Sequence, residues 1–135
     1  QAQASGLPRT GLLRQIMTSD RPAHVPDDWL GRLLSVEIDR PLGSLHPRHP
    51  EMIYPENYGF LPGTMAADGH GIDVYLLGMY TPVDRFTGRC IAILHREDDE
   101  EDKLVVSPDG ITFTDRQILA RVDFQERFFT TRLIR

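Results

Sequence analysis

Apolar and polar positions alternate over short stretches along most of this chain, which predicts strands rather than helices. LLSVEID at 33–39 is a strand stopped by Pro41, and IDVYLLGMY at 72–80 and RCIAILH at 89–95 are two more. KLVVSP at 103–108 is a fourth, ended by a proline. Several short strands with turn signals between them favour a closed or nearly closed β-barrel over alternating strand and helix units.

One segment has a helical pattern. ITFTDRQILARVDFQERFF, at 111–129, has Thr114 and Gln117 at the spacing of a capping box, with Asp115 in the first turn. The apolar face consists of Ile118, Leu119 and Val122, continued by Phe128 or Phe129. We therefore expect a helix after the strands, covering one opening or one flank of the barrel.

The first 28 residues differ from the rest, since they are small and polar and DRPAHVPDD has two prolines, as in a linker. We predict an N-terminal extension or linker over 1–28, loosely attached or packed on a neighbouring subunit. The domain proper is predicted over 29–135, and 135 residues suit one domain. The predicted fold class is mainly β with a C-terminal helix (α+β).

Composition narrows the function classes. The chain is 40% hydrophobic and 26% charged, as in globular proteins, and its net charge is -5. No basic stripe is present, so we expect no nucleic-acid partner. No apolar run reaches the roughly 20 residues that span a bilayer, so we expect no membrane. Cys90 is the sole cysteine and is expected to be a small buried hydrophobe, which fits a reducing, cytoplasmic compartment.

Acidic residues gather at two places. Asp68 and Asp73 flank a glycine-rich loop, and six acids fill 97–102, directly before Lys103. Glycine lets the loop fold back, so two carboxylates can converge on a hard cation such as Mg²⁺. The acidic run is by itself typical of a solvated loop. It follows the strand after that of Asp73, however, and consecutive strands pair or lie near each other. The two acidic groups can then meet around a cation.

Other polar side chains lie nearby. His70 is at the loop tip between the two acids, and Tyr54 and Tyr58 flank a turn. A tyrosine hydroxyl can donate to a phosphate oxygen or order a water, although Tyr54 is equally well explained by aromatic packing. Lys103 can hold a phosphate oxygen as a compact point charge.

The stretch from Met52 to Leu77 resembles the signature region of the soluble inorganic pyrophosphatases, an Mg²⁺-dependent family built on a small β-barrel. The family's YPxNYGF(I)PGT is matched by YPENYGFLPGT, and its DGDPxDV loop by DGHGIDV. EDKLVV is similar to a later acidic stretch, with Glu101 at the place of an Asp, and Glu37 stands where the family has an early acidic strand residue. The resemblance covers about residues 33–107.

Departures from the family pattern are also clear. His70 replaces the middle loop acid, and Gly71 replaces the proline after it. PLGSLHPRHP at 41–50 replaces a hairpin with phosphate-binding Lys, Glu and Arg, and this region offers Arg40, Arg48, His46 and His49. A Tyr-Lys pair near the C-terminus has no clear match. The chain therefore resembles a shortened, divergent relative, for which metal binding transfers better than activity.

The resemblance implies a small closed OB-like barrel and metal-dependent hydrolysis of inorganic pyrophosphate or a related small phosphoanhydride. The implied cofactor is Mg²⁺, with Mn²⁺ or another divalent ion as an alternative because His70 suits softer metals. The implied metal ligands are Asp68, Asp73, Glu97, Asp98, Glu101 and Glu37. The implied catalytic residues are Asp73, Tyr58 and His70, and the implied substrate-binding residues are Tyr58, Lys103 and Arg48. We also expect a homo-oligomer.

Two other functions stay open. The missing hairpin cations favour a catalytically impaired module that binds a phosphate compound or a protein partner. An oligonucleotide-binding barrel is the weakest alternative, because the chain is acidic and has no exposed basic and aromatic face.

Overall fold

The computed structural model describes residues 27–65, 69–99 and 101–135. A short 3₁₀ helix, η1, precedes a six-stranded sheet and one α-helix. In chain order the elements are η1 (Asp27–Trp29), β2 (Leu33–Arg40), β3 (Asn57–Leu61), β4 (Ile72–Leu76), β5 (Arg85–Arg96), β6 (Asp102–Ser107), α1 (Asp115–Glu126) and β7 (Thr131–Ile134). The predicted N-terminal extension falls almost entirely outside the described residues.

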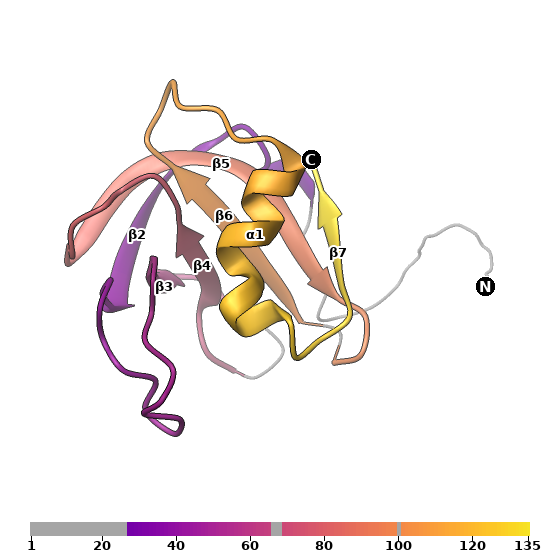
Figure 1. The fold of residues 1–135 in the computed structure, drawn as a ribbon. Helices are drawn as coiled ribbons and strands as arrows, with labels where there is room; N and C mark the ends of the chain where they lie inside the picture. Colours follow the sequence, from indigo (N-terminus) through magenta and orange to yellow (C-terminus); the bar gives the residue numbers. More distant parts are fainter. Residues whose placement is uncertain (1–26, 66–68, 100) are drawn as a thin grey trace.

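Five strands close into a barrel (Figure 1). The sheet order is β2-β3-β4-β6-β5-β7, and β2 also pairs with β5, so the ring closes and β7 adds to β5 outside it. The β4–β6 pairing is parallel and the other pairings are antiparallel. The prediction of a small, closed, OB-like barrel with a C-terminal helix is confirmed.

The barrel interior is filled by alternate positions of its strands. In β2 the buried side chains Leu34, Val36 and Ile38 point inward, as the alternation in LLSVEID predicts. Leu104 of β6 and Ile93 of β5 meet them from the other side of the ring. Burial of each such aliphatic side chain contributes about 1.5–3 kcal/mol.

Helix α1 covers one flank of the barrel, as Figure 1 shows. Thr114 and Gln117 form the predicted capping box, each side chain bonding the other's backbone N–H. Ile118 and Val122 are fully buried against the outer face of the barrel. Leu119 is exposed, and Phe128 lies beyond the last helical residue, so that part of the predicted apolar face is wrong. Among the described residues, no helix has the length and apolar character needed to cross a bilayer.

Strand β5 is longer than predicted. The prediction begins this strand at Arg89, but Arg85–Gly88 is also strand because it pairs with β2. The first half of β5 thus closes the barrel, and its second half pairs with β6 and β7. Strand β7 was not predicted, since its four residues are too few to show an alternation.

Two residues of the YPENYGF motif, Asn57 and Gly59, are needed for the fold itself. A Cβ on Gly59 would lie 1.8 Å from the carbonyl oxygen of Glu37, so β2 and β3 can approach each other only with glycine there. The buried Asn57 side chain accepts from the backbone N–H of Leu42 at 2.9 Å and donates to the carbonyl oxygen of Thr81 at 3.0 Å. The motif therefore first holds the loops around β3 in place.

Candidate functional site

Two adjoining cavities open beside β3 and β4, and both are lined by Arg40, Tyr58 and Asp73. The larger, of about 560 Å³, we call the amphipathic cavity; its wall also includes Met52, Arg96, Lys103, Gln125, Phe128 and Phe129. The smaller, of about 420 Å³, we call the acidic cavity; its wall also includes Asp39, Phe60, His70 and Gly71.

Lys103 lies at the centre of the predicted acidic cluster. Because β4 and β6 run parallel, both begin at the same end of the barrel, which brings Lys103 next to Asp73. The Lys103 Nζ atom is 2.6 Å from Asp73 Oδ2 and 2.9 Å from Glu101 Oε1. Burial acts to lower the pKa of Lys103, but the Tyr58 oxygen and the Asp73 carboxylate outweigh it and raise the pKa. The ammonium group therefore stays charged between two carboxylates.

Arg96, the last residue of β5, is a second buried cation of the site. Its Nε and Nη2 atoms donate to the Glu126 carboxylate at 3.0 and 2.8 Å, and its Nη1 atom is 3.4 Å from Asp99 Oδ2. The Phe129 ring centre lies 3.7 Å from the guanidinium carbon. Burial acts to lower the pKa of Arg96, but the hydrogen bonds that it donates to the Glu126 carboxylate raise this pKa above its usual value. Arg96 was not predicted, because nothing in the sequence links it to Glu126.

A chain of hydrogen bonds joins Arg40 to the carboxylate that holds Arg96. It runs through Arg40, Tyr54, Gln125, Tyr75 and Glu126, with donor–acceptor distances of 2.7, 3.1, 2.7 and 2.6 Å. Two of its members come from the last turn of α1. The helix therefore positions two of the cations that line the amphipathic cavity, Arg40 and Arg96, although only its capping and part of its apolar face could be predicted.

Tyr58 stands between the two cavities. Its ring packs edge-on against Tyr75, with centroids 4.9 Å apart. Burial raises the pKa of Tyr58 well above its ordinary value, with a smaller opposing effect from Lys103. Tyr58 is thus a neutral phenol that can donate a hydrogen bond but does not act as a base at neutral pH.

Asp39 and Asp73 face the acidic cavity together with His70. Asp39 lies at an irregularity in the β2–β3 register between Ile38 and Arg40, and such bulges turn a side chain away from the regular direction. Partial burial raises the pKa of Asp39; the charge of Arg40 opposes this, and the Asp73 carboxylate adds to it. Asp39 was not predicted, because an alternating pattern does not reveal a bulge.

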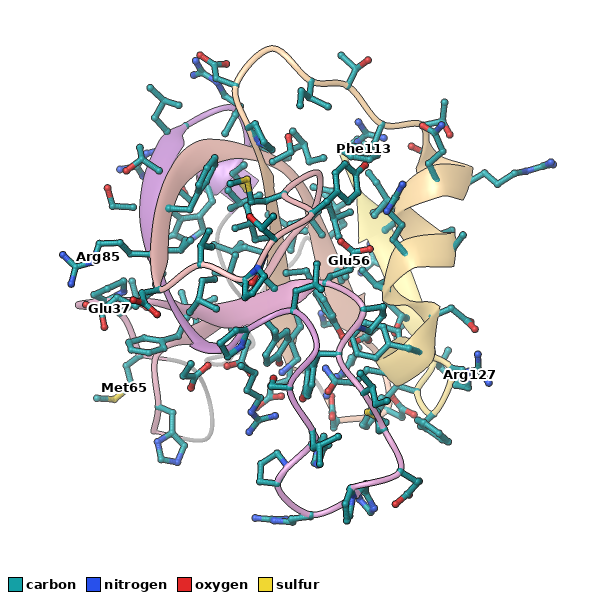
Figure 2. All side chains as sticks on the ribbon, turned by 60° about the vertical axis from the view of Figure 1, so that its left-hand side comes forward. Glu37, Glu56, Met65, Arg85, Phe113 and Arg127 are labelled. Carbon is teal, nitrogen blue, oxygen red and sulfur yellow. The ribbon has the colours of Figure 1, made fainter. Side chains whose placement is uncertain are left out.

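Glu37 is not brought to either of these cavities. In the register of the sheet, Phe60 lies between Glu37 and Asp73, and Arg85 lies opposite Glu37 on the other side. Figure 2 shows Glu37 beside Arg85 on the face away from α1. To act as the predicted metal ligand beside Asp73, Glu37 would have to reach past the Phe60 side chain.

The other predicted residues are spread around the site. Glu97 pairs with Arg132 at 3.1 Å, and Asp98 accepts from the backbone N–H of Thr130 at 3.1 Å. Arg48 is exposed on the loop after β2 and lines neither cavity. Asp68 lies outside the described residues. Within the described ranges, no group of three or more His, Cys, Asp or Glu side chains is arranged to hold a metal ion.

Comparison of the chain with known proteins identifies its relatives. A sequence profile of the family described as inorganic pyrophosphatase matches residues 34–128. The chain belongs to the inorganic pyrophosphatase family. It is 36% identical over 75 residues to an inorganic pyrophosphatase of Saccharolobus solfataricus, covering 53% of this chain and 40% of that protein. It is 46% identical over 50 residues to inorganic pyrophosphatase 1 of Pseudomonas syringae pv. tomato, covering 36% of this chain and 29% of that protein.

Solved pyrophosphatase structures share the fold. The inorganic pyrophosphatase of Neisseria gonorrhoeae aligns with a TM-score of 0.57 and 24% identity, covering 74% of this chain and 75% of that one. That of Ehrlichia chaffeensis aligns with a TM-score of 0.58 and 21% identity, covering 76% and 84%. The sequence matches span less than half the length of the two curated relatives, so the family's core barrel is what this chain has in common with them.

Membership of this family implies a requirement for a divalent metal in general. Among the described residues, such an ion fits best in the acidic cavity, which Asp39 and Asp73 both line. Their negative charges repel each other, and this repulsion adds to the effect of burial in raising the pKa of Asp39. A cation there would relieve that repulsion, and carboxylate oxygens are the ligands that Mg²⁺ and Mn²⁺ prefer. Asp73 belongs to both arrangements, because its Oδ2 atom also pairs with Lys103 Nζ at 2.6 Å.

Proposed function

We propose that this protein hydrolyses inorganic pyrophosphate, or a related small phosphoanhydride, with the help of a divalent metal ion, Mg²⁺ first. One observation carries the proposal: in a pyrophosphatase barrel, the cations Arg40, Arg96 and Lys103 border a cavity that adjoins a carboxylate pair. Cations next to a metal-binding carboxylate pair are what phosphoryl transfer requires, because charge develops on the phosphoryl oxygens.

The proposed roles follow from position. Lys103 and Arg40 hold phosphate oxygens, and Tyr58 donates a hydrogen bond between the cavities. Asp73 holds the metal ion with Asp39 and, as the family resemblance implies, Asp68 and Glu101. A bound divalent ion supplies a water that ionises near neutral pH. His70, on the wall of the acidic cavity, is the candidate to accept a proton. Arg48, Glu37, Glu97 and Asp98 keep only the roles that the family resemblance implies.

The test is phosphate release from pyrophosphate with Mg²⁺ or Mn²⁺. We expect release by the wild type and a loss of at least about 100-fold in Asp73→Asn, in line with the loss of one preorganised electrostatic group. The matched control is Asp109→Asn, which also removes a salt-bridged carboxylate but at an exposed site that lines neither cavity. Release no faster in the wild type than in Asp73→Asn would contradict the proposal.

A non-catalytic module that binds a phosphate compound or a protein partner is the second candidate. It is favoured by the engagement of Asp73 and Glu101 with Lys103, which leaves no described cluster of three metal ligands. Saturable binding of a non-hydrolysable diphosphate by a protein that releases no phosphate with any divalent ion would favour it.

We further propose a cytoplasmic, homo-oligomeric protein without a nucleic-acid or membrane partner. The burial of Cys90 supports a compartment where no disulfide is needed, and burial raises the pKa of this thiol to about 11, so it is unreactive. Light scattering during gel filtration measures the subunit number directly.

A further inference from the structure

The lining of the amphipathic cavity combines two chemistries. It includes the cations Arg40, Arg96 and Lys103 and also the apolar side chains Met52, Phe128 and Phe129. We propose that this cavity binds an organic diphosphate, in which a phosphoanhydride is esterified to an apolar or aromatic group. That the ligand is hydrolysed rests on the function proposed above, whereas recognition of its apolar group rests on the cavity alone.

The size of the cavity favours an organic ligand. Its volume is about 560 Å³, within the about 300–1,000 Å³ of pockets that enclose organic molecules. Inorganic pyrophosphate has no apolar surface to place against Met52 and the phenylalanines. An ester has such a surface, and its burial would remove both apolar partners from water.

Phe128 is a large apolar residue that lines the cavity and is exposed. Its side chain is 65% exposed, although it borders a cavity and directly precedes Phe129, which stacks on Arg96. A large apolar side chain at the rim of a concave site is typical of ligand contact rather than of core packing. An apolar or aromatic group in the cavity would have Phe128 and Met52 to pack against.

The charge of the site points the same way. Arg96 is paired with Glu126, and Lys103 is held between two carboxylates, so two of the three cations are already balanced. Partial burial and then the charge of Arg40 lower the pKa of His46, which keeps this neighbour neutral. The surplus positive charge is therefore small. Esterification removes one ionisable oxygen from a diphosphate, so an ester suits this balance better than inorganic pyrophosphate does.

The reaction of such a ligand is balanced by water alone. The water oxygen bonds to the terminal phosphorus, and the bond between that phosphorus and the bridging oxygen breaks. The bridging oxygen leaves with the inner phosphoryl group, giving inorganic phosphate and an organic monophosphate. The proton that the water loses passes to solvent or to the leaving group.

Calorimetric titration of the full chain in Mg²⁺ or Mn²⁺ tests the inference. Three non-hydrolysable probes are compared: methylenediphosphonate as the inorganic form, and the α,β-methylene analogues of adenosine diphosphate and of geranyl diphosphate. We expect at least one organic probe to bind at least about tenfold more tightly than methylenediphosphonate. Which of the two does so distinguishes a nucleotide from a prenyl source of the same chemistry.

Matched variants locate the preference. Phe128→Ala should reduce affinity for the preferred organic probe about tenfold and leave that for methylenediphosphonate within about twofold. Tyr80→Ala is the control, because Tyr80 is 63% exposed but lines neither cavity, and it should change neither affinity.

Each remaining outcome decides the matter. Equal or weaker binding of both organic probes, binding of no probe, or an equal loss for all probes in Phe128→Ala would overturn the inference. Phosphate release from pyrophosphate is measured in parallel. If phosphate is released but no organic probe binds more tightly than methylenediphosphonate, only this inference fails. If an organic probe binds more tightly but no phosphate is released, only the proposed hydrolysis fails.

Discussion

The barrel interior and the layer beneath α1 are both buried, but they consist of different kinds of side chains. The interior is filled by aliphatic side chains and Cys90. The layer beneath α1 combines Tyr54, Tyr58 and Tyr75 with the buried polar side chains of Gln125 and Glu126. The interior tolerates any well-packed aliphatic set, whereas the outer layer is stable only when each polar group keeps its partner.

This difference assigns the two regions different tasks. Buried ion pairs gain little over well-packed apolar residues of the same volume, so Arg96 and Glu126 are a poor choice for stability alone. They do hold a guanidinium at a fixed place on the cavity wall. We infer that the interior supplies most of the folding free energy and that the outer layer sets the geometry of the site.

Breaking the Arg96–Glu126 pair should have the largest effect on stability. Arg96→Met leaves the Glu126 carboxylate buried and opposite an apolar chain, which should lower the free energy of unfolding by about 3–5 kcal/mol. The double variant Arg96→Met/Glu126→Gln should recover at least half of that loss, because no buried charge remains. Urea unfolding followed by circular dichroism measures both.

Arg89→Met is the matched control for this experiment. Arg89 also makes a two-bond contact with a carboxylate, that of Asp109, but in solvent. We expect its unfolding midpoint to stay close to that of the wild type. If Arg96→Met were as mild as Arg89→Met, the outer layer would not depend on complete pairing and the comparison would fail.

A cavity in the interior should cost somewhat less and leave the site intact. Leu104→Ala removes a fully buried side chain from the barrel, with an expected loss of about 3 kcal/mol in the free energy of unfolding. Because the cations of the cavity lie on the outer layer, the affinity of the folded variant for methylenediphosphonate should stay within about twofold. A larger loss of affinity would show that the two regions are not separable.

The interior is also the region that could be predicted from sequence. Alternation in LLSVEID and IDVYL identifies the inward-facing residues, since a strand with one buried side repeats every second residue. The capping box fixed the start of α1 for the same reason of local spacing. Strand β7 and the first half of β5 were not predicted, because they form strands only by pairing with other strands.

The site was predicted only in part. The approach of Asp73 and Glu101 was expected, but as ligands of a metal ion rather than of Lys103. Arg40 was noted only as a neighbouring cation. Arg96 and Gln125 were missed altogether, because their hydrogen bonds join strand ends to a helix far along the chain. Pairings at that sequence distance follow from the closed barrel and leave no periodic signal.

Glu56 offers the smallest and most selective test of the outer layer. Figure 2 shows it beside α1, and its side chain is 4% exposed. Its Oε2 atom accepts from Arg121 at 3.1 Å, while Oε1 has no hydrogen-bond partner among the described residues. Burial raises the pKa of Glu56 above its usual 4.5, against the opposing bond from Arg121.

The sign of the pH dependence follows from that raised pKa. The folded protein binds the Glu56 proton more tightly than the unfolded chain, so this group stabilises the fold below its unfolded pKa. That contribution is lost as the pH rises through the folded pKa. In Glu56→Gln nothing titrates there, so the wild type should lose stability relative to the variant between about pH 4 and pH 7, by less than about 1 kcal/mol. Parallel urea unfolding curves across this pH range measure the difference in the free energy of unfolding. If the wild type instead became more stable relative to the variant as the pH rises, the bond from Arg121, rather than burial, would dominate the pKa of Glu56.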